Sequence, residues 1–325
     1  MRPTRSLPGL ALATLLCAAA ATLARAQDPA RAPTLPSVPD TSALPAATPL
    51  PRPVPLPAAG GTSPVRTASA SLSPALVLPQ PGAEPAPLAP AAVSAEAARL
   101  RADLSREVPG LVARDPARER SLLALLRRAV AASDFVLDHP QLLVAVDRNG
   151  AVQQISVVLA RPAGAWEVLG TTRVSTGQAG RFDHYITPLG VFAHTDLILD
   201  YRAEGTFNEN HVRGLGLKGM RVWDFGWQWA HRGWGADQSP IQIRLEMHAT
   251  DPALLARRIG HTASQGCVRI PDAMNRFLDR HGVLDAEYER AAVDEVRYRA
   301  LLLPDRVPTP LAGSVLVVVD SSGAP

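Results

Sequence analysis

Residues 241–248 read Ile-Gln-Ile-Arg-Leu-Glu-Met-His, and this stretch decides the fold. Apolar and polar side chains alternate along it, which is typical of a β-strand with one buried face and not of a helix. Its four apolar residues are therefore expected to face a core, while His248 ends the strand on the opposite face. The stretch predicts a sheet whose second face carries polar groups.

Segments on both sides of this stretch also predict strands. They are rich in β-branched residues, and Arg148-Asn149-Gly150 between the first two is a hairpin signal. The further predicted strands are 142–147, 151–160, 166–175 and 314–320. Residues 141–325 are numerous enough for one domain with a sizeable core. We therefore expect a single, mainly β domain at 141–325.

Helical patterns flank the β-rich segments. Ser94 can cap a helix that runs through Arg106, and Asp115 followed by Pro116 is typical of a second helix start. These two helices would form a helical preface at 93–140. Two later helices are expected at 272–281 and 285–302. The predicted fold class is mainly β with flanking helices.

The N-terminus has the features of an export signal. Arg2 and Arg5 precede an apolar stretch at 7–23, which ends in Ala24-Arg25-Ala26, a pattern that signal peptidase cleaves. The apolar stretch is slightly short for a membrane span. We expect a signal peptide at 1–26, an exported, periplasmic mature chain and no membrane span after cleavage. An uncleaved anchor is the alternative.

Residues 27–92 form a tract of Pro, Ala, Ser and Thr that holds more than half of the 31 prolines. Such a segment has too few apolar side chains to offset the entropy cost of ordering. We expect a disordered Pro/Ala-rich linker here. It serves either as reach into the cell wall or as a spacer without function.

Removing 1–26 changes both the charge and the cysteine count. Three of the 33 basic residues and none of the 30 acidic residues lie there, so the remainder has a formal charge of zero. The basic balance of the whole chain therefore predicts no nucleic-acid partner. Cys17 is lost with the signal, and Cys267 remains alone. Because exported proteins usually pair their thiols or lack them, this thiol is expected to have a function.

Cys267 lies among groups suited to acyl transfer, because residues 264–270 read Ser-Gln-Gly-Cys-Val-Arg-Ile. A thiol with an ordinary pKa is mostly unreactive at neutral pH, but the imidazole of His248 can take its proton and stabilise the thiolate as an ion pair. Gly266 allows a carbonyl group to approach the backbone closely, and nearby amides can stabilise an oxyanion. Arg269 offers a planar guanidinium to a carboxylate.

Together these features resemble the L,D-transpeptidase (YkuD) family. That family has a strand-end histidine, a spacer, and Ser-His-Gly-Cys followed by an apolar residue and Arg or Asn. Here His248 precedes Cys267 by 19 positions. Val174-Ser175-Thr176-Gly177 and Thr187-Pro188-Leu189-Gly190-Val191-Phe192 resemble the family's strand–loop passage beside the cleft. The resemblance covers about residues 142 to 271.

The resemblance implies a β-sandwich-like catalytic domain that acts on peptidoglycan stem peptides. In the family, the cysteine attacks the peptide bond after the third stem residue, D-alanine leaves, and an amine on a second stem or on a protein resolves the thioester. Carried over, Cys267 is the nucleophile, His248 is the base, and the Ala249 carbonyl orients the imidazole. No cofactor or metal is implied. The other expected oxyanion or orienting residues are Gly266, Gln265 and Ser264, and the expected substrate contacts are Arg269, Thr250 and Thr187. Arg269 would hold a substrate carboxylate or brace the loop.

Two positions depart from the family pattern. Ala249 replaces the usual glycine, which is tolerable where only its carbonyl is used. Gln265 replaces a histidine, so this side chain can donate a hydrogen bond but cannot titrate. The departure weakens any acid–base role for position 265 and leaves the pair of Cys267 and His248 intact.

Other interpretations stay open. The same acyl-enzyme would serve an L,D-carboxypeptidase or a crosslink-cleaving hydrolase, and a non-catalytic wall-binding module could keep the scaffold. A metal site of His248, His261 and Cys267 lacks a second cysteine or a carboxylate cluster. Four tryptophans at 223–234 predict either a loop packed on the core or a lid over the cleft, with Trp227 as a substrate contact.

Overall fold

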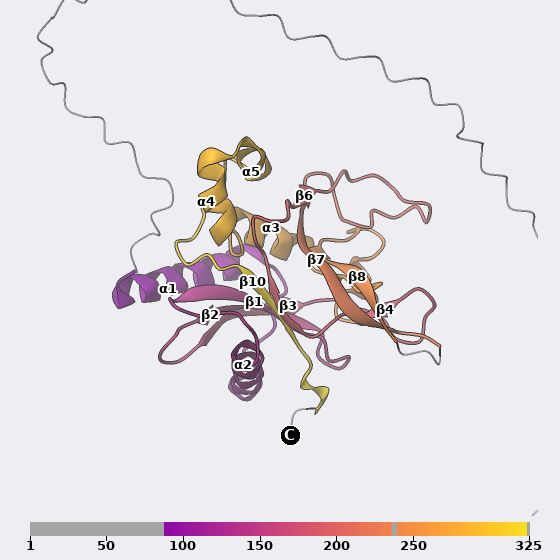
Figure 1. The fold of residues 1–325 in the computed structure, drawn as a ribbon, viewed down its shortest axis with the longest axis horizontal. Helices are drawn as coiled ribbons and strands as arrows, with labels where there is room; N and C mark the ends of the chain where they lie inside the picture. The colour runs from indigo at the N-terminus through magenta and orange to yellow at the C-terminus, as the bar shows by residue number, and fades with distance from the viewer. Residues whose placement is uncertain (1–87, 236–238, 324–325) are drawn as a thin grey trace, which may run out of the picture. The chain divides into compact units, whose positions relative to one another are not determined.

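Two open β-sheets and the helices around them make up the described structure (Figure 1). The computed structural model describes residues 88–235 and 239–323, which belong to the unit Leu76–Pro325. The predicted signal peptide at 1–26 lies outside the described residues, as does most of the predicted linker at 27–92. None of the helices in the described part of the chain has the length and apolarity that a bilayer crossing needs.

The first sheet, sheet A, has five strands in the order β3-β2-β1-β10-β5. β1 and β2 pair antiparallel, which confirms the predicted hairpin. β2 begins at Gln154 and not at Ala151, because the chain still turns at Gln153, where φ is +45°. β1 also pairs in parallel with β10, which joins the two ends of the β-rich region. The strands are β1 (Gln141–Asp147), β2 (Gln154–Ala160), β3 (Glu167–Arg173), β5 (Gly190–Ala193) and β10 (Val315–Val319).

The second sheet, sheet B, contains the stretch 241–248. Its strands are β4 (Tyr185–Ile186), β6 (Tyr201–Arg202), β7 (Arg221–Arg232), β8 (Pro240–His248) and β9 (Val268–Arg269). The order is β4-β7-β8-β9, and β6 pairs with β7. β8 alternates as predicted, with Ile243, Leu245 and Met247 buried. The prediction of a loop or lid at 223–234 was wrong, because most of this segment is strand β7, which bulges at Gly226.

In the described part of the chain, five α-helices accompany the sheets: α1 (Pro90–Glu107), α2 (Pro116–Ala131), α3 (Asp272–Arg280), α4 (Ala286–Asp294) and α5 (Val296–Leu301). The Asp115 carboxylate accepts two backbone N–H groups, which confirms the predicted cap of α2. The predicted Ser94 cap was wrong, because α1 already begins at Pro90 and the Ser94 hydroxyl bonds a carbonyl inside it. The single helix expected at 285–302 is divided at Glu295, where φ is −106° and ψ is 118°.

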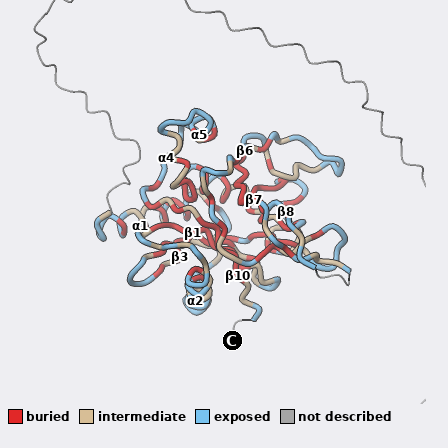
Figure 2. The backbone as a smooth tube through the Cα atoms, viewed as in Figure 1, coloured by how far each residue is buried: buried red, intermediate tan, exposed pale blue. Residues whose placement is uncertain are grey.

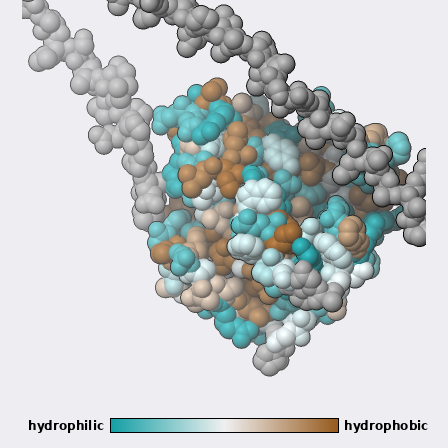
Figure 3. Space-filling model, turned by 45° about the vertical axis from the view of Figure 1, so that its right-hand side comes forward, coloured by the Kyte–Doolittle hydropathy of each residue, from teal (hydrophilic) through white to brown (hydrophobic). Residues whose placement is uncertain are grey.

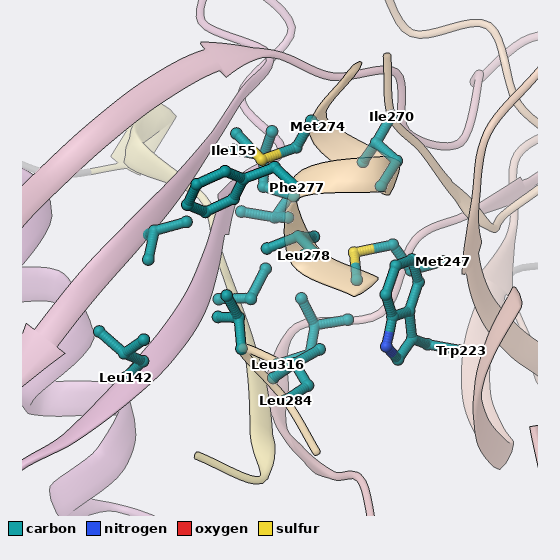
Figure 4. Packing of buried hydrophobic residues seen from close by; sticks show 14 of the residues in the cluster. Leu142, Ile155, Trp223, Met247, Ile270, Met274, Phe277, Leu278, Leu284 and Leu316 are labelled. Carbon is teal, nitrogen blue, oxygen red and sulfur yellow. The ribbon is translucent and has the colours of Figure 1, made fainter. Parts of the chain in front are cut away.

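A shared core lies between the two sheets. Side chains of β1, β2 and β10 meet those of β7 and β8 in one apolar cluster, to which α3 adds Met274 and Phe277 (Figure 4). The other face of sheet A packs on α2 in a second cluster around Leu126 and Val130. Strand β1 is consequently buried along its whole length (Figure 2).

These layers confirm the coarse prediction of a mainly β architecture with flanking helices. Both sheets are open, and neither closes into a barrel. Sheet A is covered on both faces, whereas β8 buries alternate residues and presents the others on the far face of sheet B. The exposed polar residues of β8, such as Gln242 and Arg244, therefore lie where solvent and ligands can approach, whereas His248 at the end of the strand is buried.

Candidate active site

β8 ends at His248, whose side chain is 4 % exposed. Its Nδ1–H donates to the Ala249 carbonyl at 2.5 Å, which confirms the predicted orienting contact. This bond leaves Nε2 as the basic nitrogen of the neutral ring. Burial lowers the pKa of His248 to about 4, and the positive charge of Arg269 acts in the same direction. The imidazole is therefore uncharged at neutral pH.

Cys267 lies one position before β9 and next to β8. Met247 is paired with Val268, and both are fully buried in the core. Because side chains alternate along strands, Cys267 and His248 share the opposite face of sheet B. The thiol donates to the Arg244 carbonyl, with the sulfur 3.8 Å from the oxygen. The predicted nucleophile and base are thus on one face, but the thiol must reorient before it can donate to the imidazole.

The resting site holds two neutral groups. Burial raises the pKa of Cys267 to about 11; the negative charges of Glu246 and Asp224 also raise it, and Arg269 opposes them. With the lowered pKa of His248, this leaves a thiol and an imidazole at neutral pH. Both shifts disfavour the predicted thiolate–imidazolium ion pair in the conformation in which the thiol bonds the Arg244 carbonyl. Proton transfer has to accompany the attack on a substrate.

Hydrogen bonds hold the loop before Cys267. The Ser264 hydroxyl donates to the Cys267 carbonyl at 2.6 Å and accepts the Gly266 N–H at 3.2 Å, so Ser264 orients the loop as predicted. The Thr187 hydroxyl donates to the Gly266 carbonyl at 2.7 Å and accepts the Gly177 N–H at 2.8 Å. Thr187 is fully buried. It positions Gly266, and its predicted contact with substrate is corrected accordingly.

Gly266 is needed for the conformation of this loop. Its φ is +127°, and a Cβ there would lie 2.9 Å from Cδ1 of Ile243 and 3.3 Å from Cβ of Tyr185. The missing side chain thus makes room for the protein's own packing, and not for the approach of a substrate as predicted. Its N–H would have to leave Ser264 to bind an oxyanion. The neighbouring Gln265 is exposed, so its amide can reach solvent or a ligand.

Arg269 carries an unneutralised positive charge beside Cys267. Its Nη1 donates to the Ala263 carbonyl at 3.2 Å, which braces the loop, one of the two predicted roles. Its Nε is buried without a partner. Within residues 88–235 and 239–323, no carboxylate forms an ion pair with it. Burial lowers the pKa of Arg269, but an arginine remains cationic at neutral pH. It is therefore suited to attract a carboxylate.

Two other predictions concern buried or distant residues. Thr250 is 2 % exposed and its hydroxyl lacks a partner, so in this conformation it does not face a substrate as predicted. The side chains with metal-ligand spacing in the described part of the chain are Asp103, Glu107 and His281. That group includes none of the residues of the alternative metal site.

The tryptophans of β7 are divided between the core and the outer face. Trp223 is fully buried, whereas Trp227 and Trp229 are 61 % and 64 % exposed. The strand register places Trp227 opposite Arg244 and Trp229 opposite Gln242, so both indoles share the face of Cys267. In Figure 3 the side with β7 and β8 is turned forward, and hydrophilic and hydrophobic residues are interspersed on it.

Glu246 and Asp224 were not among the predicted site residues, although both face the same side as Cys267. Tyr201 donates its hydroxyl to Glu246 at 2.8 Å. Arg244 binds Asp224 through contacts of 2.6, 2.8 and 2.9 Å. The alternation of residues 241–248 already assigned Glu246 to the polar face of the strand that carries His248. The nearness of Glu246 to Cys267 depends, however, on the pairing of β8 with β9, which the sequence does not show.

Comparison with models of known protein families found no match for this chain, and comparison with curated proteins found none either. The functional assignment therefore depends on the residues and their geometry.

Proposed function

We propose that this chain is a cysteine acyltransferase of the L,D-transpeptidase type, acting on peptidoglycan stem peptides. One observation carries the proposal: a cysteine, an oriented neutral histidine and an arginine without a carboxylate partner share the outer face of β8 and β9. The spacing of His248 and Cys267 and the motifs around them support it. The two open sheets are compatible with the β-sandwich-like domain that this proposal entails.

The chemistry follows from the neutral pair. Arg269 attracts a carboxylate of the stem peptide. The sulfur of Cys267 attacks the carbonyl carbon after the third stem residue while its proton passes to Nε2 of His248. The C–N bond then breaks, and His248 returns the proton to the departing D-alanine amine. A thioester on Cys267 remains, and an amine resolves it.

The export signal predicted from the sequence supports this assignment of substrate. The N-terminal residues 1–26 have the composition of a signal peptide, and peptidoglycan lies outside the cytoplasm. Cys267 would be the one cysteine left after the predicted cleavage, and in the structure it is half-buried on the outer face of sheet B. A single thiol in that position is suited to chemistry and not to a disulfide.

Intact mass spectrometry tests the proposal. The wild-type chain and Cys267→Ala are incubated with a tetrapeptide stem and, separately, with a carbapenem. A covalent adduct on the wild type alone, together with released D-alanine, is the expected result. No adduct on a folded wild-type chain would contradict the proposal and favour a wall-binding module. Free tripeptide as the main product would assign a carboxypeptidase instead.

Ordinary thiol labelling does not make this distinction. Because burial raises the pKa of Cys267 to about 11, its thiolate is scarce at neutral pH whether or not the chain is an enzyme. Slow alkylation is therefore expected for both functions. An acylating substrate, which engages His248 during attack, is the appropriate probe.

A further inference from the structure

Glu246 places a carboxylate beside the nucleophile, and the nearest cation, Arg244, acts on it without forming an ion pair. The pairing of Met247 with Val268 sets Glu246 next to Cys267 on the outer face of sheet B. Arg244, the one arginine of β8, is bound to Asp224. Among residues 88–235 and 239–323, no arginine, lysine or histidine forms an ion pair with Glu246. Its carboxylate accepts a hydrogen bond from the hydroxyl of Tyr201 at 2.8 Å.

This arrangement works against the first half of an acyl transfer. Glu246 and Asp224 both raise the pKa of Cys267, and so disfavour the nucleophilic form. Glu246 is itself half-buried and directly opposite Asp224, a like charge across the strands. Burial and the charge of Asp224 outweigh the stabilising effects of Tyr201 and Arg244, so the pKa of Glu246 is raised, and a further cation would stabilise its charged form. The structure therefore contains a subsite that a positively charged ligand would complete.

We propose that Glu246 binds the protonated amine that accepts the acyl group and takes a proton from it. This inference rests on the proposed acyltransferase function and assigns the acceptor side of the same site. The negative charge of the Glu246 carboxylate and the positive charge of the Arg269 guanidinium both act on Cys267. A positively charged acceptor is drawn to the first, and a carboxylate of the stem to the second.

The transfer step balances with these groups. The ammonium acceptor gives one proton to the Glu246 carboxylate and becomes a neutral amine. Its lone pair forms a C–N bond with the thioester carbonyl carbon, and the C–S bond breaks. A second N–H proton passes through His248 to the departing sulfur, which restores the neutral thiol. The Glu246 carboxylic acid finally releases its proton to water. Burial and Asp224 raise the pKa of Glu246, which favours this temporary protonation.

Partitioning of a preformed acyl-enzyme tests the role of Glu246. The acyl-enzyme made from a tetrapeptide stem is offered ethanolamine, which is cationic at neutral pH, or hydroxylamine, which is neutral. Amide, hydroxamate and hydrolysed peptide are quantified by mass spectrometry. The variants are Glu246→Gln, which keeps the size and the acceptor oxygen for Tyr201, and Glu246→Asp, which keeps the charge. Glu295→Gln, in an exposed ion pair with Arg297, is the matched control.

The expected result is a change for the cationic acceptor alone. Glu246→Gln should raise the KM for ethanolamine about tenfold, the usual size of one charge-assisted hydrogen bond, and leave hydroxylamine unchanged. Glu246→Asp should restore part of the preference, and Glu295→Gln should match the wild type. Equal effects on both acceptors, or none, in a Glu246→Gln chain that still acylates would overturn the role of Glu246 alone. A wild-type chain that forms no acyl-enzyme would overturn the proposed function and this inference with it.

Discussion

Sheets A and B share one core but bury their strands in different ways. All residues of β1 and β10 are buried, because α2 covers one face of sheet A and the shared core covers the other. In β8, the apolar residues from Ile243 to Met247 enter the core, and the polar residues between them face outward. The candidate catalytic groups lie on that outward face.

This difference in burial assigns stability mainly to sheet A and chemistry mainly to the outer face of sheet B. A strand that is apolar on both faces has no position at which a polar group could meet a substrate, so its residues contribute through packing. An alternating strand holds its backbone with one set of side chains and presents the other set. Substitutions in sheet A should therefore change mainly the free energy of unfolding, and those on the outer face of sheet B mainly turnover. The predictions that follow test this separation.

The largest effect is expected for His248→Gln. Loss of the general base should lower the rate of acylation by a stem peptide about 10²- to 10⁴-fold. The chain should remain folded, because the glutamine amide can still donate to the Ala249 carbonyl. Time-resolved intact mass spectrometry measures the rate, and circular dichroism checks the fold. A rate close to that of the wild type would show that another group takes the thiol proton.

Leu143→Ala in β1 should lower stability and leave acylation unchanged, the opposite of the result expected for His248→Gln. Leu143 is fully buried in the cluster between sheet A and α2, and its truncation should lower the free energy of unfolding by about 2–5 kcal/mol. Urea unfolding measures this loss. Acylation per folded molecule should be unchanged well below the unfolding temperature. A variant that is equally stable but acylates poorly would contradict the separation of the two sheets.

The pH dependence of stability should be traceable to His248. Its pKa falls from 6.5 to about 4 on folding, so between these values the unfolded chain binds more protons. His248 therefore contributes roughly 3 kcal/mol to the free energy of unfolding above pH 6.5, relative to its contribution at low pH. This contribution is lost as the pH falls toward 4. Urea unfolding of wild type and His248→Gln across this window measures it. Equal slopes for the two chains would refute the assignment.

The smallest effect is expected for Trp227→Ala. This indole is 61 % exposed on the outer face, so its loss should hardly change stability. Loss of an aromatic contact with substrate should lower kcat/KM for peptidoglycan fragments about two- to tenfold. Trp227→Tyr, which keeps a ring, serves as the control. Unchanged turnover in Trp227→Ala would remove this residue from the substrate-binding surface.

Local patterns predicted much of the fold correctly. Three features could be predicted from the sequence because each depends on neighbouring residues: the alternation of 241–248, the turn at 148–150 and the Asp115 cap. The errors arose where distant packing decides. The tryptophan segment contains glycine and charges, yet pairing with β8 makes it a strand. Likewise, no local signal marked the division of the last helical segment at Glu295.

In the candidate site, too, local sequence signals were informative, whereas burial, which depends on distant packing, was not predicted. The residues around Cys267 and His248 and their resemblance to a known family predicted this pair and the role of the Ala249 carbonyl, and the structure supplies the last contact. The sequence did not predict that Thr187 and Thr250 are buried. Both are polar residues in motif positions. A motif specifies which residue types are present, but it does not specify how deeply they are buried in the fold.

By itself, the sequence determined the composition of the N-terminus and the alternating strand that ends at His248, because these are properties of composition and short-range periodicity. Tertiary structure alone decided that Glu246 lies beside Cys267, and that burial raises the pKa of the thiol and lowers that of the imidazole. The reason is physical: the energy of a charge depends on its burial and its neighbours, and both are fixed by the pairing of β8 with β9.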